Sequence, residues 1–320
     1  MSPIITKPRA LVARKVFPEV LERLAEAVEL ETNQDDGVFS QAELADRLKD
    51  KDGALRLKIV ANIAAGYNNL DFAALTATGV MATNTPDVLT ETTTDFGWAL
   101  LMAAARRVTE SEHFLRAGKW NKWSLVDGFL GQDIYGATLG ILGMGRIGQA
   151  LARRAKGFGM RVIYHNRSRL AEDVEAECGG AYVGKEELLR SADHLVQVLP
   201  YSAATHHAIG AVELAHMKPS AVLVHLARGG IVDENALAAP LREGRLFTAG
   251  IDVFEDEPKV NPALTALSNV VLTPHIASAS DATRRCMANL AADNLLAGLG
   301  LGRQAGRPPS LLNPEVLGKQ

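Results

Sequence analysis

The chain has 320 residues, 47% of them hydrophobic, a length that suggests about two domains at roughly 150 residues each. Its 34 Lys and Arg residues against 37 Asp and Glu residues give a net charge of −3, which argues against a nucleic-acid or membrane-surface binder, since such proteins need a concentrated basic face. The two cysteines, Cys178 and Cys286, lie in no Cys/His cluster. We therefore expect two buried free thiols and neither a disulfide nor a metal site.

The first residues carry no apolar core of signal-peptide length, and the longest apolar stretch, 96–105, is too short to span a bilayer. These features predict a cytoplasmic protein without a membrane partner.

In the first part of the chain, short β-branched runs alternate with helical patterns. We predict strands at 10–14, 28–31, 58–64 and 79–84, and helices at 18–27 and from Ser40 to about residue 50. Ser40 and Glu43 have the spacing of a capping box, which marks the start of the second helix. Alternation of this kind is typical of a parallel sheet covered by helices.

A long helix from about residue 89 opens a second alternating series. Its predicted strands are 137–143, 161–166, 194–199, 221–226, 248–253 and 270–274. A last helix is expected at about 280–299, followed by an irregular Gly- and Pro-rich tail from residue 302.

These series predict an α/β protein with two doubly wound parallel-sheet domains. We place the first part of one domain at 1–85 and a Rossmann domain at 86–276. Residues 277–320 then return to the first domain, so that the C-terminal helix completes it.

The glycines of the run 143–148 have the spacing GxGxxG, between a predicted strand and a predicted helix. In a dinucleotide-binding βαβ unit, Gly143 allows the tight turn, Gly145 lets the backbone approach a pyrophosphate, and Gly148 lets helix and strand pack closely. The helix N-terminus then offers free N–H groups to the phosphates. The alternatives are a purely structural turn or a site for another nucleoside.

The end of the next strand, Asn166-Arg167-Ser168-Arg169, indicates which dinucleotide binds. Sites for NAD place a carboxylate there, which accepts a hydrogen bond from the ribose 2′-hydroxyl. No carboxylate is present, whereas Arg167 and Ser168 suit a 2′-phosphate. We therefore expect NADPH or NADP to be preferred, with NADH or NAD usable.

Three further segments each follow a predicted strand, and they carry Arg228, Glu257 and His275. Strand ends meet at one edge of a parallel sheet, so these side chains are expected near the nicotinamide. Arg228 suits a planar anionic substrate and His275 can donate a proton to a developing alkoxide, while Glu257 can orient and stabilise the imidazolium. The set favours hydride transfer to a 2-keto acid.

These motifs resemble the D-2-hydroxyacid dehydrogenase superfamily, in particular its glyoxylate/hydroxypyruvate reductase and 2-ketogluconate reductase branch. The matching stretches run in the expected order over nearly the whole chain: ANIAAGYNNLD (61–71), TNTPDVLTETTTD (83–95), TLGILGMGRIGQALA (138–152), YHNRSR (164–169), LARGGIVDENAL (226–237), TAGIDVFEDEP (248–258) and LTPHIASA (272–279). The resemblance implies a flavodoxin-like fold for the first domain.

The resemblance also assigns roles to single residues. Ala65 and Gly66 match the loop whose N–H groups hold the substrate carboxylate, together with Arg228 and His275. Asp252 matches a carboxylate that faces the nicotinamide carboxamide. The other expected cofactor contacts are Thr94, Gly143, Gly145, Arg146, Ile147, Gly148, Asn166, Arg167, Ser168, Leu199, Pro200, Thr205 and Ala227. A homodimer built through about 88–130 is implied as well.

Two positions depart from the family pattern. His225 stands where the pattern usually has Asn, and it is expected to perturb the loop of Arg228. Leu55 is followed directly by Arg56, where family members typically carry another strand and helix. We hypothesise that residues are missing from the sequence at this junction.

The sequence thus predicts NADPH-dependent reduction of glyoxylate or hydroxypyruvate to a D-2-hydroxy acid. Reduction of 2-ketogluconate is an alternative within the same branch. A dinucleotide-sensing binding protein without catalysis is an alternative of another class, and a phosphoglycerate-type dehydrogenase is a third.

Overall fold

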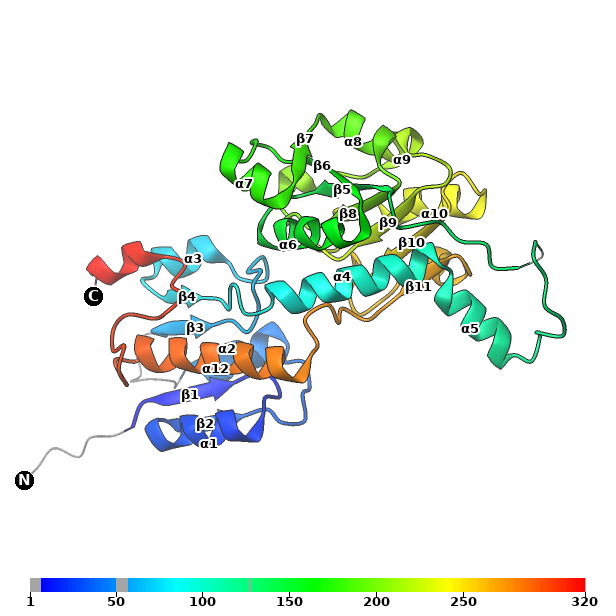
Figure 1. The fold of residues 1–320 in the computed structure, drawn as a ribbon. Helices are drawn as coiled ribbons and strands as arrows, with labels where there is room; N and C mark the ends of the chain where they lie inside the picture. Colours follow the sequence, from blue (N-terminus) through cyan, green and yellow to red (C-terminus); the bar gives the residue numbers. More distant parts are fainter. Residues whose placement is uncertain (1–6, 50–56, 127, 320) are drawn as a thin grey trace, which may run out of the picture. The chain divides into compact units, whose positions relative to one another are not determined.

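The computed structural model describes residues 7–49, 57–126 and 128–319. The chain forms two compact units (Figure 1). Unit 1 comprises Met1–Leu89 and Ser280–Gln320, and unit 2 comprises Thr90–Ala279. Each unit is described separately below.

Seven parallel strands form the sheet of unit 2, in the order β11-β10-β9-β8-β5-β6-β7. Their bounds are β5 Thr138–Leu142, β6 Arg161–His165, β7 Gly180–Tyr182, β8 His194–Gln197, β9 Val222–His225, β10 Thr248–Ile251 and β11 Val270–Leu272. Strand β5 pairs with β6 on one side and with β8 on the other, so the strand order reverses at β5. In open parallel sheets, ligands bind at the carboxyl ends of the strands beside such a reversal.

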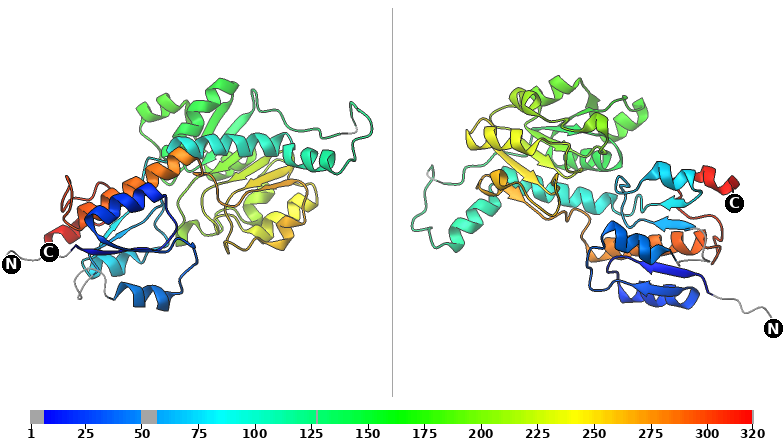
Figure 2. Two further views of the ribbon diagram at one scale, coloured as in Figure 1. Left: turned by 90° about the horizontal axis from the view of Figure 1, so that it is seen from below. Right: turned by 180° about the vertical axis from the view of Figure 1, so that it is seen from behind.

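Helices cover both faces of this sheet (Figure 2). Their bounds are α4 Thr90–Ala105, α5 Val108–Arg116, α6 Arg146–Ala155, α7 Glu172–Cys178, α8 Lys185–Ser191, α9 Ala211–His216, α10 Glu234–Arg242 and α11 Pro262–Thr265, with short 3₁₀ turns at Lys156–Phe158 and Ala203–Thr205. Ile141 of β5 packs with Leu151 of α6 on one face, and Leu195 of β8 packs with Leu188 of α8 on the other. Burial of each such side chain contributes about 2 kcal/mol. The α/β class and the parallel Rossmann sheet are confirmed.

Unit 1 contains two short parallel sheets. Strand β1 (Arg9–Val12) pairs with β2 (Glu29–Thr32), and β3 (Ile59–Ala61) pairs with β4 (Met81–Thr83). The expected single doubly wound sheet is not continuous here, because no strand within the described residues joins β1 to β3. The junction between residues 55 and 56 lies outside the described residues, so the hypothesis about it stays a prediction.

The helices of unit 1 include the one expected to return from the C-terminus. Their bounds are α1 Pro18–Ala27, α2 Gln41–Leu48, α3 Phe72–Ala77, α12 Asp281–Gly298 and the 3₁₀ helix η3 Pro314–Lys319. Helix α12 packs against α1 and β3. Gly298 lies so close to Ile59 that a Cβ on the glycine would be 2.4 Å from the Ile59 side chain. The predicted capping box is present, since Ser40 N–H donates to Glu43 Oε2 (2.8 Å) and Glu43 N–H donates to Ser40 Oγ (3.2 Å).

The C-terminal tail is irregular up to the 3₁₀ helix η3, as expected, but specific contacts hold it in place. Asn313 Oδ1 accepts from the Ala82 N–H (2.8 Å), and Asn313 Nδ2 donates to the Val80 carbonyl (2.9 Å). Val316 is completely buried beside Ile59 and Met81. These contacts join positions more than 230 residues apart in the chain, and no local periodicity reveals them.

Cys178 is buried, as expected, but Cys286 is exposed. The prediction fails for Cys286 because that position lies on the solvent side of α12, whereas its neighbours Met287 and Ala288 are buried.

Within 7–49, 57–126 and 128–319, no helix is long and apolar enough to cross a membrane. Nor do three or more His, Cys, Asp or Glu side chains of these ranges gather where they could hold a metal ion.

Candidate active site

The glycine loop connects β5 to α6 at the point where the strand order reverses. Gly143 has φ +103°, and a Cβ there would lie 2.8 Å from the Leu199 nitrogen. A Cβ on Gly148 would lie 2.4 Å from the Gly143 carbonyl oxygen. These two glycines are therefore required by the packing of the turn itself.

Gly145 differs from the other two glycines. A Cβ there would meet no protein atom within 4 Å, so the backbone faces open space at the N-terminus of α6. Arg146 and Ile147 form the first turn of that helix. A glycine that the packing does not require, at the N-terminus of a helix, fits a bound pyrophosphate.

Asn166 connects the end of β6 to this loop. Its Oδ1 accepts a hydrogen bond from the Met144 N–H at 2.6 Å. Asn166 stands at the position where NAD sites usually have a ribose-binding carboxylate. Its side chain therefore holds the glycine loop. Sequence reasoning placed Asn166 in the cofactor site but did not reveal this contact.

The two arginines after β6 have different surroundings. Arg169 donates two hydrogen bonds to Glu175, at 2.9 and 2.7 Å. Tyr164 donates to the same carboxylate at 2.5 Å. Arg167 and Ser168 are exposed, and within the described residues the Arg167 guanidinium has no ion pair. Arg167 is thus the arginine available to a ligand.

The ion pair has electrostatic consequences. Hydrogen bonds from Arg169 and Tyr164 lower the pKa of Glu175 to about 2. Burial, together with the Glu175 carboxylate, raises the pKa of Tyr164 to about 12. The carboxylate and the phenol therefore keep this arrangement over the neutral pH range.

The loop after β8 contains Leu199, Pro200 and Thr205. The Thr205 hydroxyl donates to the Pro200 carbonyl at 3.0 Å and accepts from the Ser202 N–H at 2.7 Å. These contacts close the loop on itself.

Thr94, expected near the nicotinamide, is buried in α4, and its hydroxyl donates to the Thr90 carbonyl at 2.7 Å.

The strand ends of β9, β10 and β11 carry the expected catalytic residues. His275 and Glu257 lie together, with His275 Nδ1 2.8 Å from Glu257 Oε2. The other carboxylate oxygen accepts from the Phe254 N–H at 3.0 Å, which fixes the orientation of Glu257. Both side chains are partly exposed, so His275 Nε2 is the ring nitrogen left for a substrate.

Arg228 lies in the turn after β9. Its Nη1 donates to the Ala227 carbonyl at 2.7 Å. Burial lowers the pKa of the Arg228 guanidinium, and the nearby Glu257 carboxylate opposes that shift. A Cβ on Gly229 would be 1.8 Å from the Phe254 carbonyl oxygen, so the two loops pack backbone to backbone. The structure thus brings Arg228, Glu257 and His275 to neighbouring loops.

His225, the departure from the family pattern, ends strand β9 directly beside Gln197 of β8. Both side chains are buried, and within the described residues none of their four nitrogen and oxygen atoms has a hydrogen-bond partner that meets normal geometry. Burial lowers the pKa of His225 to about 4, although the nearby main chain of Arg228 opposes that shift. The neutral imidazole therefore lies under the loop that carries Arg228.

Ala65 and Gly66 lie in unit 1, after β3. Asn84 Nδ2 donates to the Ala65 carbonyl at 2.7 Å, and Asn62 Nδ2 donates to the Gly66 carbonyl at 3.0 Å. Within the described residues, neither the Ala65 nor the Gly66 N–H donates to a backbone carbonyl. Sequence reasoning missed Asn62 and Asn84, since an Asn near a turn has no distinctive spacing.

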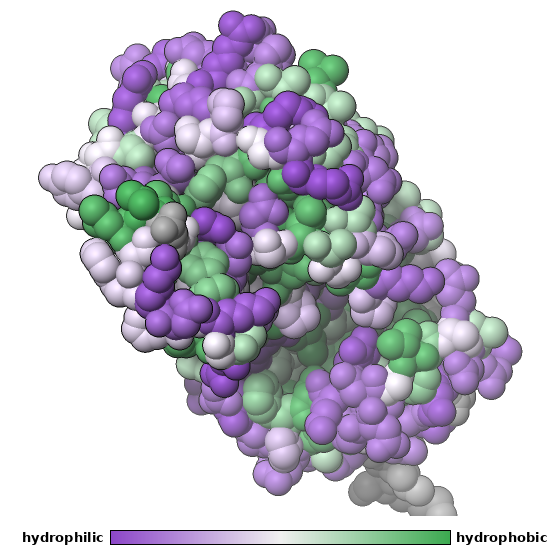
Figure 3. Space-filling view, turned by 90° about the vertical axis from the view of Figure 1, so that its right-hand side faces the viewer, coloured by the Kyte–Doolittle hydropathy of each residue, from purple (hydrophilic) through white to green (hydrophobic). Residues whose placement is uncertain are grey.

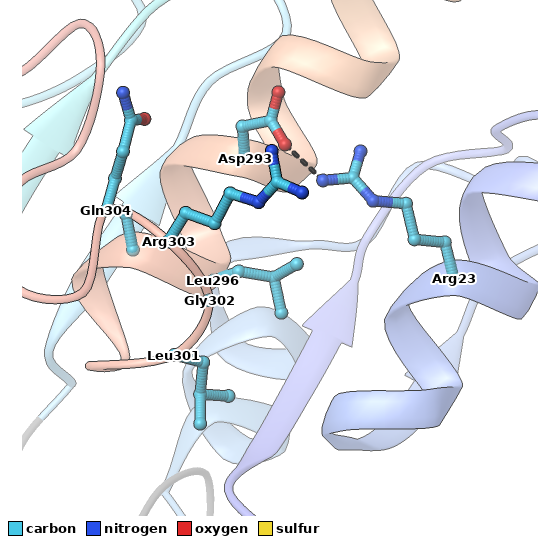
Figure 4. A pocket seen from close by; sticks show the side chains of 8 residues that line it. Arg23, Asp293, Leu296, Leu301, Gly302, Arg303 and Gln304 are labelled. Carbon is cyan, nitrogen blue, oxygen red and sulfur yellow. Dashed lines mark hydrogen bonds and ion pairs between the residues drawn. The ribbon is translucent and has the colours of Figure 1, made fainter.

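Unit 1 also has a surface hollow, which is no part of these loops (Figure 4). Arg23 of α1 and Asp293 of α12 form an ion pair across it. The remaining lining residues are Leu296, Ala297, Leu301, Gly302, Arg303 and Gln304. Because Asp293 neutralises one of its arginines, the hollow has little excess charge to attract an anionic substrate.

Comparisons with known proteins show which family the chain belongs to. Residues 98–277 match the model of the family "D-isomer specific 2-hydroxyacid dehydrogenase, NAD binding domain". The chain is 45% identical to a glyoxylate reductase of Thermococcus onnurineus over 331 residues, covering 97% of each chain. It is 47% identical to a glyoxylate reductase of Aeropyrum pernix over 333 residues, with the same coverage.

A solved structure shares the fold over nearly the whole length. It is an NADPH-dependent glyoxylate/hydroxypyruvate reductase of Sinorhizobium meliloti in complex with NADP and malonate. Its TM-score is 0.83 at 35% identity, covering 97% of this chain and 98% of that one. The chain therefore belongs to the D-isomer-specific 2-hydroxyacid dehydrogenase superfamily, in its glyoxylate reductase branch, and is an NAD(P)-dependent oxidoreductase that reduces 2-keto acids.

Proposed function

We propose that this enzyme reduces small 2-keto acids, glyoxylate and hydroxypyruvate foremost, to D-2-hydroxy acids with NADPH. The observation that carries the proposal is the 2.8 Å contact between His275 and Glu257 beside the loop of Arg228. A dinucleotide-sensing protein has no need of an oriented proton donor. The pair therefore favours catalysis over that alternative.

Each residue has one proposed task. Arg228 binds the substrate carboxylate and keto oxygen. His275, protonated and held by Glu257, gives its proton to that oxygen and becomes neutral. A bound reduced nicotinamide supplies the hydride for the keto carbon. The product is then a 2-hydroxy acid, and its D configuration is what the family resemblance implies.

For Ala65 and Gly66 we propose binding of the substrate carboxylate through their N–H groups. The fixed carbonyls of this loop support that role, because Asn84 and Asn62 prevent the peptide planes from turning. Two N–H groups in a fixed orientation form a suitable anion site.

The preference for NADPH rests on the loop after β6. Arg167 and Ser168 are exposed there, while Arg169 is held by Glu175. A guanidinium and a hydroxyl can both hydrogen-bond a 2′-phosphate, whereas Asn166 offers no carboxylate to a 2′-hydroxyl. In this proposal the pyrophosphate is held by the loop of Gly143, Gly145 and Gly148. The other cofactor contacts proposed are Thr94, Arg146, Ile147, Leu199, Pro200, Thr205, Ala227 and Asp252.

A homodimer is proposed from the segment after α5, which extends away from the rest of unit 2 (Figure 1). Figure 3 looks onto the side on which this segment lies, and apolar side chains stand out there among hydrophilic ones. The most exposed apolar residues of the segment are Trp120, Trp123, Leu125, Val126, Leu130 and Tyr135. Apolar surface concentrated in this way favours association with a second copy.

Sedimentation tests the dimer. The double variant Trp123→Ser, Leu125→Ser should raise the dimer dissociation constant at least about thirtyfold, since each truncated anchor costs roughly 1–3 kcal/mol. Val38→Ser, at a position 81% exposed in unit 1, is the matched control and should leave association unchanged. A wild-type monomer at micromolar concentration would contradict the proposal.

A cytoplasmic location is also proposed, since reducing conditions keep Cys178 and Cys286 as free thiols.

Initial rates test the substrate and the cofactor together. NADPH and then NADH oxidation are measured with glyoxylate, hydroxypyruvate and 2-ketogluconate in parallel. We expect the highest kcat/KM with NADPH and one of the first two acids. A higher value for 2-ketogluconate would favour the alternative within the branch, and a higher value for NADH would contradict the cofactor assignment.

A further inference from the structure

Asp252 is a completely buried carboxylate, one residue after strand β10. Its Oδ1 accepts from the Thr273 hydroxyl at 2.7 Å and from the Ile276 N–H at 2.9 Å. Its Oδ2 accepts from the Ala277 N–H at 2.9 Å. Its main-chain carbonyl accepts from the His275 N–H, also at 2.9 Å. One residue therefore binds the loop 273–277 on both sides of His275.

The loop needs such support because of its backbone. His275 has φ +51°, a left-handed conformation that is unfavourable for residues other than glycine. Conformations of this kind persist only where the surroundings hold them. The Pro274 ring supplies no N–H, so the N–H groups of His275, Ile276 and Ala277 are the donors of the turn, and all three reach Asp252.

The main chain of Asp252 is also bound to the strand that leads to the arginine loop. The Asp252 N–H donates to the His225 carbonyl at 2.9 Å, and His225 precedes the turn of Arg228 by three residues. Asp252 is thus hydrogen-bonded both to the strand that leads to Arg228 and to the turn that carries His275.

We propose that Asp252 and Thr273 are positioning residues for His275: the buried carboxylate, completed by the Thr273 hydroxyl, keeps the turn in the conformation that places the imidazole on Glu257. The inference rests on the proposed role of His275 as proton donor. Neither residue touches the substrate in this account. Asp252 Oδ2 accepts a single hydrogen bond from the protein, so the positioning role is compatible with the cofactor contact proposed above for the same carboxylate.

Thr273 allows a sharp test, because its hydroxyl can be removed while its shape is kept. In Thr273→Val, the carboxylate loses one charge-assisted hydrogen bond, and we expect kcat to fall about tenfold. The Kd of NADPH, measured by fluorescence titration, should stay within about twofold, since the glycine loop is untouched. Thr273→Ser restores the hydroxyl and should keep kcat within about twofold of the wild type.

Asp252→Asn tests the carboxylate itself. The amide keeps one oxygen but sets an NH₂ group against the N–H donors of the turn, so kcat should fall by more than in Thr273→Val. Asp256→Asn, at an exposed position four residues further along the same loop, is the matched control and should have wild-type kcat.

Three outcomes would overturn the inference. One is an unchanged kcat in Thr273→Val. Another is an equal loss in Thr273→Ser and Thr273→Val. The third is a loss of kcat/KM that is matched by a rise in the NADPH Kd, which would indicate a direct cofactor contact. The variant His275→Gln separates this inference from the proposed function. If His275→Gln retains wild-type kcat, the proton-donor role itself fails. If His275→Gln is inactive while Thr273→Val is unaffected, only the positioning role is refuted.

Discussion

His275 Nδ1 lies 2.8 Å from Glu257 Oε2, and the second oxygen of that carboxylate accepts from the Phe254 N–H. The hydrogen bond fixes the orientation of the ring. This contact therefore leaves Nε2 as the ring nitrogen that can face a substrate.

Glu257→Gln should lower kcat about tenfold. The amide replaces a charge-assisted hydrogen bond to Nδ1 with a weaker neutral one, so the ring of His275 is held less firmly. The measurement is kcat at saturating NADPH, with the NADPH Kd as a second readout that should stay within about twofold. A wild-type kcat in this variant would show that the pair does not act in the reaction.

Gly145→Ala and Gly148→Ala should have opposite effects. A Cβ on Gly145 meets no protein atom within 4 Å, so the unfolding free energy should fall by at most about 1 kcal/mol, the usual cost of Ala at an N-cap. Its methyl group would occupy the space proposed for the pyrophosphate, and the NADPH Kd should rise about tenfold or more. Gly148→Ala places a Cβ against the Gly143 carbonyl and should lose about 2 kcal/mol of stability. Urea unfolding and fluorescence titration of both variants decide this, and unchanged NADPH binding in Gly145→Ala would argue against the pyrophosphate site.

Arg167→Ala should weaken NADPH about tenfold and leave NADH within about twofold, because a charged hydrogen bond contributes roughly 1.5–3 kcal/mol. Arg169→Ala is the matched control. It removes the partner of Glu175 rather than a ligand contact, so any loss should be similar for both dinucleotides. The KM values of both dinucleotides in both variants are the measurement. Equal weakening of NADPH and NADH in Arg167→Ala would contradict the 2′-phosphate assignment.

His225 should make the enzyme less stable in mild acid. Burial lowers its pKa to about 4, whereas the unfolded chain binds the proton near pH 6.5, so the unfolded state gains protons first as the pH falls. The stability due to the neutral ring is full above pH 6.5 and is lost between about pH 6.5 and pH 4, by up to about 3 kcal/mol. His194, whose pKa is lowered by burial in the same way, contributes to the same slope.

Urea unfolding at several pH values isolates the contribution of His225. His225→Asn should flatten the slope of unfolding free energy against pH in this window. His113→Asn, which removes an exposed imidazole, should keep the wild-type slope. Identical slopes in His225→Asn and the wild type would show that His225 is not buried as a neutral ring.

Much of the cofactor unit could be predicted from short-range patterns. The run 143–148 between a β-branched strand and a helix defines a turn in which each glycine is needed for a different steric reason. The structure shows this requirement directly at Gly143 and Gly148. The positions of Arg228, Glu257 and His275 after successive strands could also be predicted, because parallel strands place their carboxyl ends at one edge. The comparisons bear out the family that these motifs indicate.

Other features had no local signal. Arg167 and Arg169 are equivalent in the sequence, and only the fold of α7 against β6 brings Glu175 to one of them. The burial of Val316 and the hydrogen bonds of Asn313 depend on strands more than 230 positions away.

The residue types, their order and their spacing were thus enough to predict the family of this protein and the chemistry proposed for it, because each motif follows a strand and parallel strands end at one edge of the sheet. The tertiary structure was needed to show how those groups are held. Asp252 illustrates the division: its place in the motif suggested a ligand contact, while its burial and its hydrogen bonds to Thr273, Ile276 and Ala277 carry the further proposal that it supports a strained turn. The physical reason is that a hydrogen bond between loops depends on distances in space, and spacing along the chain does not encode them.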